Sequence, residues 1–165
     1  MALENSYPQS LQDDRLMKQL DLTLSSNLSE RIDSNPNQCF VNAFHGVYQI
    51  EKALYIQGYL VSSKFYSFPV PHAWVEAEGK LIDPTYRYIR DCGELWYYAA
   101  QEFTTLELDN ALEMSNYDLS LPICNQNPVE GWEDLLTFDS NYLIAYEAAI
   151  SKCLSLEVQV LCKSS

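Results

Sequence analysis

Three residues of the chain, Cys39, His72 and Asp83, are of the types that thiol-based catalysis requires. A cysteine thiolate is a strong nucleophile, an imidazole exchanges protons near neutral pH, and a carboxylate fixes the orientation of an imidazole ring. Together such groups attack the carbonyl carbon of an amide and form a thioester. The elements that carry the three residues must therefore bring them together.

Two of the three residues lie in the stretch 68–85, FPVPHAWVEAEGKLIDPT, which has the pattern of a β-hairpin. Its side chains alternate with a period of two, and Glu78-Gly79 signals the turn. With the turn at this position, Trp74 lies opposite Asp83, so His72 and Asp83 become diagonal neighbours on one face. A register slip of one residue would place them on opposite faces.

Cys39 lies near the start of a predicted helix. Residues 34–37, Ser-Asn-Pro-Asn, favour a helix N-terminus, and we expect the helix to run to about Gly58. The free N–H groups and the positive dipole end of a helix start favour a thiolate. A cysteine that only packs in the core could occupy the same position. The other histidine, His45, lies more than half a turn from Cys39 around the helix, so we do not expect it to be the base.

The rest of the chain indicates a single α+β domain over residues 1–165. We expect helices over 11–28, 104–114 and 141–154, strands over 59–66 and 96–103, a loop over 116–132, and a short edge strand or frayed tail over 156–165. This divides the domain into an N-terminal helical segment (1–33), a catalytic core (34–105) and C-terminal helices (106–165). The N-terminal helix is expected to pack on the core, with a partner-docking arm as the alternative.

Composition excludes several classes of function. The net charge of −13 disfavours nucleic acid and anionic membranes as partners, and is compatible with a cationic partner or simply with a solvated acidic surface. The five cysteines form no CxxC pair, so neither a zinc site nor a complete disulfide set is expected, and we expect no metal or cofactor. Without a signal peptide or an apolar run of about 20 residues, the sequence favours the cytoplasm. An exported effector without a classical signal would look the same.

Taken together, the motifs resemble those of the transglutaminase-like superfamily. The resemblance rests on Gln38-Cys39-Phe40-Val41, on His72-Ala73-Trp74-Val75-Glu76 and on Ile82-Asp83-Pro84-Thr85, and it spans residues 37–85, about a third of the chain. The hairpin also resembles that of the peptidases that remove the leader from lasso peptides. The large calcium-dependent transglutaminases have a calcium loop that is not recognisable here, so calcium dependence is not expected.

The resemblance implies a papain-like fold, in which a capped helix bearing the nucleophile Cys39 packs on an antiparallel sheet, with His72 as base and Asp83 as its orienting group. The implied substrates are amides of peptides or proteins, cleaved by a peptidase, amidase or glutamine deamidase. Besides the backbone N–H of Cys39, the side chain of Gln38 is a candidate oxyanion donor, and Trp74 either forms a wall of the cleft or simply packs. The alternatives are a protein-crosslinking transglutaminase and a non-catalytic binding protein that retains this fold.

Overall fold

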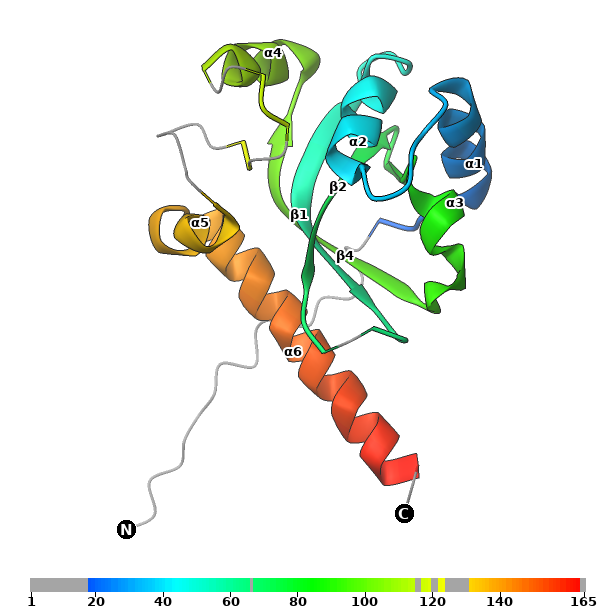
Figure 1. Ribbon diagram of the computed structural model, residues 1–165, viewed down its shortest axis with the longest axis vertical. Coiled ribbons are helices and arrows are strands. Elements are labelled where there is room, and N and C mark those ends of the chain that lie inside the picture. The colour runs from blue at the N-terminus through cyan, green and yellow to red at the C-terminus, as the bar shows by residue number, and fades with distance from the viewer. Residues whose placement is uncertain (1–17, 66, 115–116, 120–121, 124–130, 164–165) are drawn as a thin grey trace.

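One four-stranded antiparallel sheet organises the part of the chain that the computed structural model describes, residues 18–65, 67–114, 117–119, 122–123 and 131–163 (Figure 1). The strands are β1 (Leu54–Ser62), β2 (Val70–Ala77), β3 (Lys80–Ile82) and β4 (Leu95–Phe103), in the spatial order β3-β2-β1-β4. The helices in these residues are α1 (Leu22–Arg31), α2 (Cys39–Val47), α3 (Tyr86–Ile89), α4 (Thr105–Met114), α5 (Trp132–Phe138) and α6 (Ser140–Lys163), with a 3-10 turn, η1 (Arg90–Cys92), after α3. The predicted α+β class is confirmed.

The hairpin β2–β3 has the predicted register. Val75 pairs with Ile82 and Ala77 pairs with Lys80. The two residues of the turn, Glu78-Gly79, both have positive φ, 51° and 76°, as expected for a tight hairpin turn that follows the twist of its strands. The segment that carries His72 and the residues just before Asp83 therefore forms as the local pattern predicts.

The helix that carries Cys39 is shorter than predicted. α2 ends at Val47, and residues expected to form its last turns form the start of β1. The chain reverses at Lys52, which has a positive φ of 56°. Because β1 lies in the middle of the sheet, its side chains are buried on both faces, and such a continuous apolar run cannot be distinguished from a buried helix by periodicity.

Gly58, predicted as the end of that helix, lies in the middle of β1. The β1–β4 ladder changes register between Gln57 and Gly58, which marks a β-bulge. A Cβ atom on Gly58 would lie only 2.0 Å from the backbone oxygen of Tyr98. Only glycine therefore allows β4 to approach β1 this closely.

The remaining helices differ from the predictions mainly at their ends. Asp21 caps α1, accepting a hydrogen bond from the Leu24 N–H at 2.9 Å, so α1 begins later than the helix predicted over 11–28 and extends past its end to Arg31. The capping box of α4 is confirmed: the Thr104 N–H donates to Glu107 Oε2 at 2.8 Å. The part of the predicted N-terminal helix over 11–17 lies outside the described residues.

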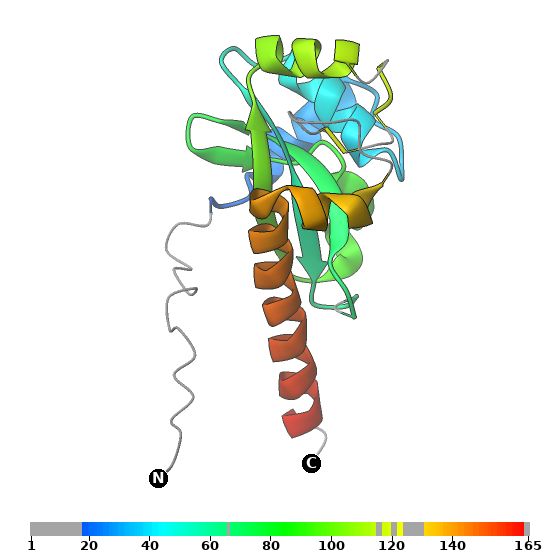
Figure 2. The same cartoon turned by 90° about the vertical axis from the view of Figure 1, so that its left-hand side faces the viewer.

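At the C-terminal end, two predictions were wrong. Trp132 does not close a loop but begins α5, while most of the predicted 116–132 loop lies outside the described residues. α6 continues through Lys163, so the expected edge strand or frayed tail is helical. Leu156 follows Cys153 at helical spacing and is buried with it, which extends the apolar face of the helix. Figures 1 and 2 show that α6 reaches past the end of the sheet.

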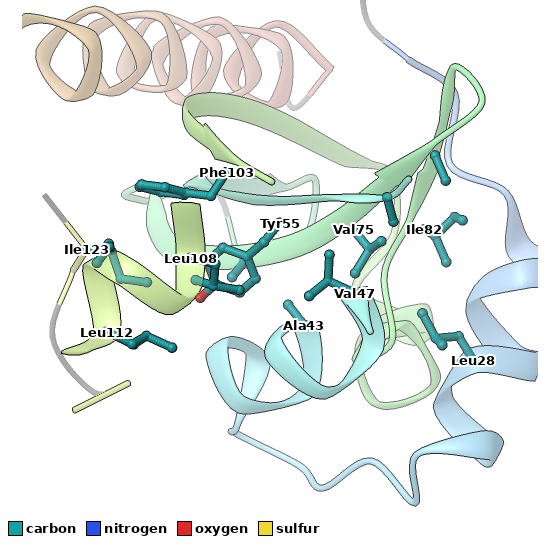
Figure 3. Close-up of a cluster of buried hydrophobic side chains, with 14 residues drawn as sticks. Leu28, Ala43, Val47, Tyr55, Val75, Ile82, Phe103, Leu108, Leu112 and Ile123 are labelled. Carbon is teal, nitrogen blue, oxygen red and sulfur yellow. The ribbon is translucent and has the colours of Figure 1, made fainter. Parts of the chain in front are cut away.

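α2 and α6 pack on the same face of the sheet, at different places along β1. Tyr55, Tyr59 and Val61 share this face, because side chains two apart on a strand point the same way. α2 packs against Tyr55 with Ala43 and its neighbours, as Figure 3 shows, and α6 packs against Tyr59 and Val61 with Tyr142. The opposite face carries a smaller apolar cluster, made of Ile56, Leu60, Trp74, Leu81 and Tyr97.

Candidate active site

Cys39 is the first residue of α2, with Gln38 as the N-cap. The first hydrogen bond of the helix runs from the Asn42 N–H to the Gln38 carbonyl oxygen, at 2.8 Å. The N–H groups of Cys39 and the two residues that follow it have no acceptor within the helix. The positive end of α2 is therefore directed at the sulfur atom, which favours the thiolate.

The side chain of Asn42 connects the start of α2 to the segment that follows Asp83. Its Oδ1 accepts from the backbone N–H of Asn35 at 3.0 Å, and its Nδ2 donates to the backbone oxygen of Asn35 at 2.8 Å. Nδ2 also donates to Thr85 Oγ1 at 3.2 Å. These bonds are buried or half-buried, and they hold Cys39 near the end of the β2–β3 hairpin.

The thiol of Cys39 lies at the edge of β2 that β3 leaves uncovered. β3 ends at Ile82, opposite Val75, so the residues at the start of β2 have no neighbouring strand on that side. The Cys39 sulfur takes this place, near enough to the His72 ring and the backbone N–H of Ala73 for both to lower the pKa of its thiol. A short β3 is thus what allows a helix residue to reach a histidine in the sheet.

His72 and Asp83 form a buried pair. His72 Nε2 lies 2.8 Å from Asp83 Oδ2, and the two residues are 4% and 0% exposed. Because Nε2 faces the carboxylate, Nδ1 is the ring nitrogen left for the Cys39 thiol. The structure therefore brings together all three residues singled out in the sequence, with the imidazole between the sulfur and the carboxylate.

Three further groups hold Asp83 in place, and sequence reasoning missed two of them. Tyr97 donates its hydroxyl hydrogen to Asp83 Oδ2 at 2.9 Å, and the Thr85 N–H donates to Oδ1 at 2.7 Å. The backbone N–H of Asp83 donates to Ser25 Oγ in α1 at 2.9 Å. Tyr97 lies in the strand predicted over 96–103 but was not singled out as a site residue, and nothing in the local sequence marks Ser25. Only the pairing of β4 with β1 and the docking of α1 reveal them.

The charges at the site favour a thiolate–imidazolium pair. Burial alone lowers the pKa of His72, but the Asp83 carboxylate and Cys39 outweigh it and raise the pKa to about 10. Burial alone raises the pKa of Cys39, but the His72 charge and the hydrogen bonds from His72 and the Ala73 N–H bring it below the usual 9.0. Burial and the neighbouring Asp83 charge raise the pKa of Tyr97 well above 10, so its hydroxyl stays a donor.

A cavity of about 680 Å³ opens beside Cys39 and His72. Its walls come from the start of α2, the facing parts of β1 and β2, and the α3–η1 segment; they include Phe40, Leu60, Phe65, Val70, Tyr88 and Leu95. Pockets that bind small molecules typically have volumes of about 300–1,000 Å³. Cys39 and His72 therefore lie at the wall of an open space.

The other predicted site residues lie at the margins. Trp74 is 1% exposed and does not line this cavity; its ring stacks near His72, with centroids 6.4 Å apart, and its Nε1 donates to Glu76. It therefore packs beside the imidazole inside the core and forms no wall of the cavity beside Cys39. The Gln38 side chain is exposed and does not cap α2, so its role as an oxyanion donor stays a prediction. His45 is exposed on the last turn of α2.

Comparisons of the chain with family models, with curated proteins and with solved structures find no match. The cysteines in the described residues, Cys39, Cys92, Cys153 and Cys162, are free, and Cys124 lies outside them. No cluster of three His, Cys, Asp or Glu side chains suited to a metal ion occurs in the described part of the chain. Among the helices described, none has the length and apolar character to span a bilayer.

Proposed function

We propose that this chain is a cysteine-dependent hydrolase with a papain-like fold of the transglutaminase-like type, and that it cleaves amide bonds of peptides or proteins. The observation that carries the proposal is the buried imidazole of His72, which lies 2.8 Å from Asp83 and interacts with the Cys39 thiol closely enough to lower the pKa of that thiol. The open cavity beside the sulfur adds room for a substrate.

In the first half of the proposed reaction, the Cys39 thiolate attacks the carbonyl carbon of the amide. The oxyanion that forms accepts hydrogen bonds, and the N–H of Cys39 at the start of α2 is the nearest candidate donor. As the C–N bond breaks, the His72 imidazolium gives its Nδ1 proton to the departing amine. A thioester on Cys39 and a neutral imidazole remain.

In the second half, water attacks the thioester carbonyl carbon. His72 accepts a proton from that water, the C–S bond breaks, and the Cys39 thiolate is regenerated while the carboxylic acid leaves. Asp83 keeps the ring oriented throughout, because its Oδ2 holds Nε2 while Tyr97 and the Thr85 N–H hold the carboxylate. We favour hydrolysis over transfer because nothing found in the sequence identifies a site for an acceptor amine.

The first test is selective labelling combined with trapping of the acyl-enzyme. At pH 7, iodoacetamide should modify Cys39 well before the other cysteines, as mass spectrometry of the peptides would reveal. Incubation with a mixed peptide library should produce cleavage fragments and a mass increase on Cys39 that hydroxylamine removes. His72→Gln should lower turnover about 10²–10⁴-fold.

Slow and equal labelling of all five cysteines, with no acyl adduct from any peptide, would contradict the proposal. That result would favour a binding protein that retains the three residues. A matched control is His45→Gln, which removes the other, exposed histidine and should leave labelling and turnover unchanged.

A further inference from the structure

The cavity beside Cys39 differs in character from the rest of the surface. The protein carries a net charge of −13, yet no Asp, Glu, Lys or Arg is found among the described residues that line this cavity. Apart from the two reacting groups, its polar lining consists of neutral residues such as Asn37, Ser62 and Thr85. A charged side chain buried here would lose its hydration without gaining a partner.

Aromatic and aliphatic side chains form most of the wall. Leu60 of β1 is 8% exposed at the floor, whereas Phe65, Val70 and Tyr88 at the rim are 67%, 43% and 39% exposed. Large apolar side chains that remain exposed beside a reactive group mark a surface that binds something. An apolar group entering from solvent would cover them and release their hydration water.

We propose that this cavity is the specificity pocket of the enzyme, and that it takes a large uncharged apolar side chain, aromatic or branched aliphatic, next to the scissile amide. This inference rests on the function proposed above and names its substrate class. It favours cleavage of backbone amides beside residues such as Phe or Leu. A free glutamine side chain would offer the pocket no apolar group to bury.

The pocket can be probed without turnover, because an alkylating agent that carries an amino-acid side chain reports on binding next to Cys39. We would compare iodoacetyl-phenylalanine amide, iodoacetyl-lysine amide and iodoacetyl-glycine amide, each normalised to its rate with glutathione. The phenylalanine probe should modify Cys39 at least about ten-fold faster than the glycine probe, since even one methylene in an apolar pocket is typically worth 10–200-fold. The lysine probe gives a stringent contrast, because long-range attraction to an acidic protein would accelerate it.

A charge placed at the rim should reverse the preference. Phe65→Asp puts a carboxylate into the pocket and should slow the phenylalanine probe while accelerating the lysine probe, each several-fold. Phe68→Asp is the matched control, because the substitution makes the same change of charge. Phe68 is 64% exposed and does not line the pocket. The control should leave the ratio of the two rates unchanged.

The outcomes separate this inference from the function on which it rests. A Cys39 that reacts quickly with iodoacetamide but shows normalised rates near one for all three probes overturns the pocket assignment and leaves the catalytic thiolate in place. A lysine probe faster than the phenylalanine probe, or equal effects of Phe65→Asp and Phe68→Asp, overturns it as well. A Cys39 no more reactive than glutathione toward iodoacetamide contradicts the proposed function, whatever the ratio of the probes.

Discussion

α2 and α6 pack on the same face of the same sheet, and each carries a cysteine that is at least partly buried. The pKa values of the two thiols are shifted in opposite directions. The pKa of Cys39, the first residue of α2, is lowered, whereas burial raises the pKa of Cys153 in the middle of α6. Cys153 is 4% exposed and belongs to the apolar cluster under α6. Burial alone therefore makes an inert thiol.

The difference between the two cysteines comes from the groups that surround each sulfur. Cys39 has free N–H groups at a helix start, the backbone N–H of Ala73 at an uncovered strand edge, and the His72 imidazole. Cys153 lies within a long helix, where the backbone N–H groups are already paired with carbonyl oxygens. The lowered pKa of Cys39 thus goes with a helix end and a strand edge that meet at the same place.

The largest expected effect comes from removing each thiol in turn. Cys39→Ala should abolish acyl-enzyme formation and peptide cleavage, because the Cys39 thiolate is the nucleophile of the proposed reaction. Cys153→Ala should retain full turnover and lower the free energy of unfolding by about 1 kcal/mol through lost packing. Mass spectrometry of the acyl adduct and urea denaturation would measure the two effects. Retained cleavage in Cys39→Ala would contradict the comparison directly.

The pH dependence of alkylation should sharpen the contrast. The thiolate is the species that reacts, and its fraction grows as pH rises through the pKa of each thiol. The pKa of Cys39 lies below 9.0 and that of Cys153 lies above it. As pH is increased, the alkylation rate of Cys39 should therefore begin to rise at a lower pH than that of Cys153. At pH 7, Cys39 should react at least about ten-fold faster than Cys153. Exposed Cys162 gives the rate of an accessible thiol and controls for burial.

Turnover should show a second limb at high pH. Protonation of the leaving amine requires the imidazolium, and the pKa of His72 is raised to about 10. Turnover should therefore rise with the Cys39 thiolate, stay high, and fall as pH passes about 10 and His72 loses its proton. A fall near pH 6.5, the ordinary histidine value, would show that Asp83 does not support the ring.

Among the changes expected to lower turnover, Tyr97→Phe has the smallest effect. This change removes a hydroxyl that donates to Asp83 Oδ2 and should lower the free energy of unfolding by about 1.5–3 kcal/mol, with a several-fold loss of kcat. Tyr59→Phe is a matched control on β1, because the buried Tyr59 hydroxyl has no hydrogen-bond partner among the described residues. That control should be neutral or stabilising in urea denaturation. Equal effects of the two substitutions would show that Tyr97 only packs.

The parts of the site that lie in one hairpin could be predicted from the sequence. The period-two pattern and the turn at Glu78-Gly79 fix the register, so the proximity of His72 and Asp83 follows from local geometry. The position of Cys39 at a helix start was also readable, because cap residues precede it. The end of the same helix was not, because the apolar run that follows is buried on both faces of β1 and satisfies either period.

The supporting groups could not be predicted, because they come from distant segments. Tyr97 reaches Asp83 only because β4 pairs with β1, and Ser25 does so only because α1 docks beside β3. Asn42 resembles any polar helix residue until its hydrogen bonds to Asn35 and Thr85 are seen. Such contacts depend on tertiary packing, for which one sequence carries no local signal.

The order in which these parts assemble has a practical consequence. The base and its carboxylate are eleven positions apart and belong to one hairpin, whereas the thiol joins them only when α2 docks on the sheet. An unfolded chain therefore contains five ordinary cysteines, and the acidic thiolate exists only in the native state. The alkylation rate of Cys39, measured through a urea titration, therefore reports the fraction of correctly folded molecules.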